Sequence, residues 1–122
     1  MKYDYNALMK EIYEEVRALG IPVSGNIEPE VQINTRAKKR YGRCMRLHGE
    51  KYEYRIEVSA YLEDKDENCV RSVLAHELLH TCPRCMNHKL LWKTYAGKMN
   101  NAYSYCIRSE EHTSELQSRQ VI

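Results

Sequence analysis

The sequence contains no phenylalanine and no long hydrophobic run, and these absences limit the classes of protein to which the chain can belong. Its longest apolar runs are only a few residues, too short for a transmembrane helix. The first residues lack the apolar centre of a signal peptide, so we expect a cytoplasmic protein. Ten tyrosines and one tryptophan supply the aromatic side chains, and their polar tips suit half-buried positions at the rim of a small core.

Cysteine and charge show no strong bias either. Five cysteines are an odd number, whereas a secreted disulfide framework normally uses an even one, so we expect reduced thiols or metal ligands. The 19 Lys and Arg residues against 17 Asp and Glu residues give a net charge of +2, which is too balanced to indicate nucleic-acid binding by composition alone. A length of 122 residues suits one small globular domain.

Residues 108–122 differ from the rest of the chain. They read RSEEHTSELQSRQVI, without apolar periodicity, which predicts a disordered polar tail. The stretch from Arg108 to Ser118 also resembles the translation of a common sequencing-library adapter. We therefore expect residues 1–107 to form the natural domain and residues 108–122 to be a disordered tail and a sequence artefact.

Hydrophobic periodicity divides the domain into three helices and three strands. The pattern predicts, in chain order, a helix over residues 5–19, strands over 31–36, 43–47 and 52–59, and helices over 69–80 and 89–103. Asn68 is the expected N-cap of the second helix. The order of one helix, a three-stranded antiparallel unit and two further helices predicts the fold class α+β.

The second predicted helix carries an HExxH pattern at residues 76–80. His76 and His80 lie one turn apart on the same helical face and can hold one metal ion, while Glu77 can act as general base on a water at that metal. Zinc suits imidazole ligands and keeps one position for water in a catalytic site, so a third protein ligand is needed. His88 takes that place by elimination among the remaining histidines.

The neighbouring cysteines leave an alternative open. His80, Cys82, Cys85 and His88 could together build a closed structural zinc site, which would have no open position and therefore no hydrolytic activity. The interpretation that we prefer treats these cysteines as loop residues or small buried hydrophobes. Cys44 and Cys69 are expected in the core, and Trp92 and Tyr95 are expected to pack the last helix onto the metal helix.

The sequence HELLH, a turn, Asn87-His88 and then Trp92 resemble the SprT-like zinc metallopeptidases. The segment Tyr41-Gly42-Arg43-Cys44 is also similar, and the resemblance covers about residues 5–105. It implies a minimal zincin-like domain, in which the metal helix packs across a small antiparallel sheet. It also implies the zinc ligands His76, His80 and His88 and the catalytic base Glu77. The spacer before His88 is shorter than in Spartan-type members and carries two cysteines.

A basic cluster without any acidic residue occupies residues 36–46. Its candidate nucleic-acid contacts are Arg36, Lys38, Lys39, Arg40 and Arg43. Such a run can bind phosphates, and Tyr41 could stack on a base. The alternative is an ordinary solvated loop and strand face.

Taken together, these features predict a monomeric zinc metalloendopeptidase that hydrolyses protein or peptide substrates by a zinc-activated water with Glu77 as base. DNA-associated proteins are one substrate class that the resemblance to Spartan-type relatives suggests. Two alternatives are a zinc-stabilised nucleic-acid-binding module without catalysis and a metal-free binding protein.

Overall fold

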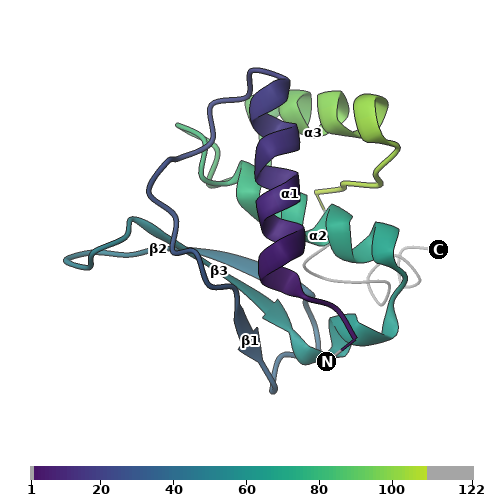
Figure 1. Ribbon diagram of the computed structural model, residues 1–122. Helices are drawn as coiled ribbons and strands as arrows, with labels where there is room; N and C mark the ends of the chain where they lie inside the picture. The colour runs from purple at the N-terminus through teal and green to yellow at the C-terminus, as the bar shows by residue number, and fades with distance from the viewer. Residues whose placement is uncertain (1, 110–122) are drawn as a thin grey trace.

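The computed structural model describes residues 2–109, so residues 110–122 of the expected tail lie outside the described part of the chain. The domain has the predicted class α+β, with three α-helices, a short 3-10 helix and one three-stranded sheet (Figure 1). Its elements are α1 (Tyr5–Ala18), β1 (Gln32–Asn34), β2 (Gly42–Arg46), β3 (Tyr54–Ser59), η1 (Ala60–Asp64), α2 (Glu67–Leu79) and α3 (Leu90–Tyr103).

Helix α2 is the centre of the domain, packed against α1, α3, β2 and β3. Every residue from Ser72 to His80 is buried, as expected for a helix that is apolar over most of its surface. The helix begins earlier than predicted, because the Asp66 carboxylate accepts a hydrogen bond from the Cys69 backbone N–H at 2.8 Å and caps it. Asn68, the predicted cap, instead donates to the Ser104 carbonyl at 3.1 Å.

The sheet is mixed, whereas the sequence pattern predicted an antiparallel unit. The strand order is β1-β3-β2, with β2 antiparallel and β1 parallel to β3. The connection from β1 to β2 crosses the end of β3, where the Ser59 backbone N–H donates to the Tyr41 carbonyl at 2.8 Å and its hydroxyl donates to the Ala37 carbonyl at 2.6 Å. Strand β3 is therefore central and β2 is an edge strand.

The two faces of the sheet have different environments. Tyr54, Ile56 and Val58 alternate along β3 and are buried on the side of the helices, as predicted. On the opposite face, Arg55 donates to the Glu28 carboxylate at 2.8 Å and 3.1 Å. Those hydrogen bonds lower the pKa of Glu28, and they tie the segment before β1 to the sheet.

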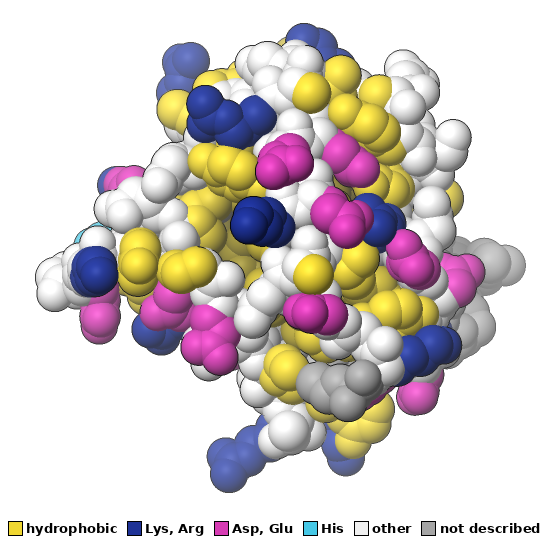
Figure 2. Space-filling view, viewed as in Figure 1, with side chains coloured by type: hydrophobic (Ala, Val, Ile, Leu, Met, Phe, Trp, Pro, Cys, Tyr) yellow, Lys and Arg dark blue, Asp and Glu magenta, His cyan; other side chains and the backbone are white. Residues whose placement is uncertain are grey.

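Helix α1 packs against α2 and buries an apolar stripe (Figure 1). This stripe consists of Tyr5, Leu8, Met9, Ile12 and Val16. The outward side of α1 carries acidic and basic side chains interspersed with apolar ones (Figure 2), as the amphipathic pattern predicted. Among residues 2–109, no helix has the length and apolar character needed to cross a membrane.

The central position of α2 predicts where the domain is most sensitive to truncation. Leu74 is completely buried, so Leu74→Ala should lower the free energy of unfolding by about 2–5 kcal/mol through lost contacts and a residual cavity. Leu90, 79% exposed at the start of α3, is the matched control, and Leu90→Ala should change it by less than about 0.5 kcal/mol. Urea unfolding followed by circular dichroism measures both; equal effects would contradict a core centred on α2.

Candidate metal centre

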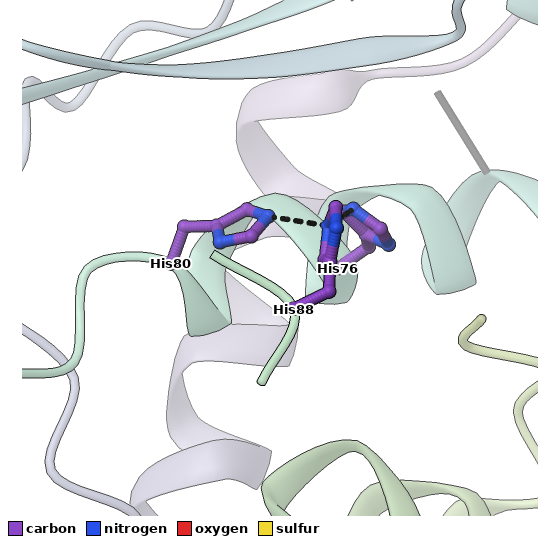
Figure 3. A group of neighbouring side chains, drawn as sticks. All are labelled: His76, His80 and His88. Atoms are coloured by element: carbon purple, nitrogen blue, oxygen red, sulfur yellow. Dashed lines mark hydrogen bonds between the residues drawn. The ribbon is translucent and has the colours of Figure 1, made fainter. Parts of the chain in front are cut away.

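Three histidines converge between α2 and the loop that precedes α3 (Figure 3). The Nε2 atom of His88 lies 3.1 Å from Nε2 of His80 and 3.1 Å from Nε2 of His76. His76 and His80 are buried and His88 is half-buried. The structure thus brings together the three residues predicted as ligands, and they form a group that could hold a metal ion.

The spacing of these nitrogens fits a small tetrahedral ion. With metal–nitrogen bonds of about 2.0–2.1 Å, tetrahedral zinc holds its ligand atoms ~3.3 Å apart. The 3.1 Å separations at His88 are close to that value. Imidazole nitrogens are also suitable donors for zinc and related divalent ions, so the donor set and the two separations at His88 fit such a metal.

A backbone carbonyl fixes the orientation of the His80 ring. Nδ1 of His80 lies 2.6 Å from the Cys85 carbonyl oxygen, and because a carbonyl only accepts, Nδ1 carries the proton and donates. Nε2 then presents its lone pair toward His76 and His88, as a metal ligand must. Sequence reasoning could not find this contact, because the acceptor is a main-chain atom with no residue signature.

The turn after α2 brings His88 back to the helix. The Cys85 backbone N–H donates to the Cys82 carbonyl at 3.1 Å, and Arg84 adopts a left-handed conformation with φ of 62°, which reverses the chain. The Thr81 hydroxyl anchors the start of this turn by accepting from the Ser24 backbone N–H at 3.1 Å. An eight-residue separation is therefore enough for His88 to reach the helix that carries His80.

Trp92 supports all three imidazoles from α3. Its ring is 1% exposed and stacks on His80 with an interplanar angle of 20° and a centroid distance of 5.5 Å. It also lies edge-on to His76 at 4.8 Å and to His88 at 4.7 Å. The prediction that Trp92 packs the last helix onto the metal helix is confirmed, and Tyr95 packs partly buried against the same core.

Glu77 is buried beside the histidines. It is 1% exposed, and its Oε2 lies 3.9 Å from Nε2 of His76. The carboxylate fits there because Gly42, at the start of β2, has no side chain: a Cβ at that position would lie 2.9 Å from Val73 Cγ1 and 3.0 Å from Glu77 Oε2. Gly42 belongs to the segment that resembles the SprT-like family, but its closeness to Glu77 depends on the packing of β2 against α2, which the sequence does not show.

A hollow of about 310 Å³ opens over this group, and we call it the histidine hollow. It is lined by Arg40, Arg43, Cys44, Glu77, His80, Met86 and His88. Cys44 was expected in the core but is half-buried and belongs to this wall. Burial, and then the Glu77 carboxylate, raise the pKa of the Cys44 thiol, so it stays protonated.

The basic cluster divides in space. Arg40 and Arg43 line the histidine hollow, whereas Arg36, Lys38 and Lys39 are exposed and do not. Tyr41, considered for base stacking, is half-buried against the core with Lys65 Nζ 5.4 Å from its ring centre. None of these contacts shows nucleic-acid binding.

The alternative four-ligand site is not assembled within residues 2–109, where the histidine group is the only cluster with metal-ligand geometry. Cys82 and Cys85 are fully buried and not joined by a disulfide. Burial, followed by the neighbouring Cys85, raises the pKa of Cys82 to about 12, so its thiol is protonated at neutral pH. Both cysteines therefore behave as small buried hydrophobes.

No family model, no curated protein and no solved structure matches this chain.

The contact between Gly42 and Glu77 gives a prediction. Gly42→Ala should lower the free energy of unfolding by about 1–3 kcal/mol, because the added methyl overlaps Val73 and Glu77. Gly97→Ala, in the middle of α3 with open space around a built Cβ, should instead raise it by up to about 1 kcal/mol. Thermal and urea unfolding of both variants measure the contrast; a neutral Gly42→Ala would show that β2 does not abut Glu77 this closely.

Proposed function

We propose that this protein is a zinc-dependent endopeptidase of the SprT-like type. The observation that carries the proposal is the convergence of His76, His80 and His88 beside a buried carboxylate, with His80, His88 and that carboxylate lining a hollow. Helix α2 buries two imidazoles and the Glu77 carboxylate. Their desolvation costs several kcal/mol of folding free energy unless a ligand or hydrogen bonds compensate it. A hydrolytic metal site gives each of these groups a chemical task.

The proposed roles follow from position. His76, His80 and His88 would hold the ion through Nε2, with the Cys85 carbonyl fixing the His80 tautomer. A zinc ion, when bound, supplies Lewis-acid chemistry that polarises a scissile carbonyl and acidifies water. Glu77 would take a proton from the attacking water at its carboxylate and pass it to the leaving amine.

Three features favour a catalytic over a structural site. A structural zinc has four protein ligands, whereas the described residues bring together three. The histidine group also borders a hollow that is open to the surface. Finally, the edge strand β2 forms part of its wall, where an extended polypeptide could pair by strand addition. The proposal also includes the substrate class, the location and the oligomeric state. We propose that the enzyme acts on DNA-associated proteins, that it is cytoplasmic and that it is a monomer.

The first test separates metal binding from catalysis. Glu77→Gln should retain one zinc per chain but lower cleavage of a generic unfolded protein by about 10²–10⁴-fold, because only the base is lost. Glu67→Gln, an exposed glutamate in the first turn of the same helix, should leave both unchanged. The measurements are zinc content after dialysis and the cleavage rate, with and without single-stranded DNA. If the zinc-loaded wild type cleaves nothing under either condition, the protease proposal fails.

The second test distinguishes an enzyme from a zinc-stabilised module. His88 is half-buried and sits outside the helices, so His88→Ala should abolish stoichiometric zinc while the domain stays folded. Near-ultraviolet circular dichroism and melting of the metal-free variant provide the readouts. If the metal supplied the folding energy, as in zinc-dependent modules, the variant and the chelated wild type would both be unfolded.

A further inference from the structure

A second and larger hollow shares the Met86 side chain with the histidine hollow. This outer hollow, of about 740 Å³, lies between the β2–β3 hairpin and the turn after α2. Met86, 46% exposed, lines both hollows, so they adjoin at its side chain. Strand β2 contributes to both, with Arg43 and Cys44 lining the histidine hollow and Arg46 lining the outer one, and we call the two hollows together the groove.

Arginine dominates the charge of this groove. Arg40 and Arg43 line the histidine hollow, and Arg46 and Arg84 line the outer one. The acidic residues in the two walls are Glu77 and Glu53. The groove therefore carries four guanidinium groups against two carboxylates, one of which is the proposed catalytic base.

Two of these arginines have no acidic partner within residues 2–109. Arg40 lies 4.0 Å from Glu57, and Arg46 lies 3.4 Å from Glu53. Arg43 and Arg84 are exposed and form no ion pair with any carboxylate of the described residues. The N–H donors of their guanidinium groups are available to bind a carboxylate from another molecule.

We propose that this groove selects acidic polypeptide segments, with Arg43 and Arg84 binding Asp or Glu side chains on either side of Met86. This inference rests on the proposed endopeptidase function, because it names the class of substrate that the same site would bind. Guanidinium–carboxylate hydrogen bonds are charge-assisted and geometrically specific, and two of them, one in each hollow, would orient a chain lying along β2.

The placement of the arginines favours a polypeptide over a nucleic acid. A phosphate backbone would be expected to use the whole basic run, yet Arg36, Lys38 and Lys39 lie outside the groove. Single-stranded nucleic acid also needs aromatic rings on which bases can stack. Tyr54 is the tyrosine in the groove wall, but it is buried, and the Arg46 guanidinium lies 6.0 Å from its ring centre.

The test measures binding separately from cleavage, in the Glu77→Gln background with zinc bound. The probes are a short fluorescein-labelled peptide containing several Glu residues and the same peptide with Gln in their place. By fluorescence anisotropy, the Glu peptide should bind about tenfold more tightly at physiological salt, and added salt should reduce the difference. Arg43→Gln/Arg84→Gln should bring the ratio to within about twofold without weakening the Gln peptide.

A charge-matched control removes two positive charges elsewhere. Lys51→Gln/Lys98→Gln, at exposed positions outside both hollows, should retain the tenfold preference. Equal binding of the two peptides, or an equal loss in this control, would overturn the proposal. It would also be overturned if a labelled single-stranded oligonucleotide bound more tightly than the Glu peptide and lost affinity in Arg43→Gln/Arg84→Gln.

The outcomes separate the two proposals. If wild-type protein cleaves unfolded substrates but the mapped sites show no enrichment of Asp or Glu, the acidic selectivity fails and the endopeptidase proposal stands. If the Glu peptide binds as expected but nothing is cleaved, the groove is an acidic-peptide site and the endopeptidase proposal fails.

Discussion

Burial of polar side chains within α2 is the constraint around which the domain is arranged. His76, Glu77 and His80 are 0%, 1% and 4% exposed, and such burial is costly unless each group is matched by a hydrogen bond, a charge or a metal. The surrounding elements supply contacts to the imidazoles. The turn after α2 brings the Cys85 carbonyl and His88 to the histidine group, and α3 places Trp92 against the imidazoles.

The helices outside the site hold α2 in place mainly by apolar contact. Arg71 of α2 donates to Glu11 of α1 at 2.6 Å and to Glu67 at 2.8 Å, but these carboxylates are more than half exposed. Ion pairs of that kind contribute about 0–1 kcal/mol. Each buried apolar side chain of the α1 stripe contributes about 1.5–3 kcal/mol, so hydrophobic burial dominates and the ion pairs add orientation.

Local chemistry explains which features could be predicted from the sequence. Helical periodicity located α1, α2 and α3 to within a few residues, and the HExxH spacing placed His76 and His80 on one face because i and i+4 positions are neighbours on any helix. No local periodicity predicts His88, which was reached by elimination and by the family resemblance, since its position depends on a turn whose left-handed residue is Arg84 rather than glycine. The Asp66 cap was missed because two good cap residues compete within three positions.

Strand order could not be predicted, because alternation reports which face of a strand is buried and not which strand is its neighbour. The prediction of an antiparallel unit was wrong for β1, which pairs parallel to β3. In the observed order β2 is an edge strand, so Gly42 abuts Glu77 while the same strand contributes Arg43, Cys44 and Arg46 to the groove. From the cluster of basic residues at 36–46, only Arg40 and Arg43 line the same hollow as His80 and His88. Two hydrogen bonds at Ser59, to the carbonyls of Tyr41 and Ala37, attach the segment that precedes β2 to the end of β3, and this long-range contact has no signature in the sequence.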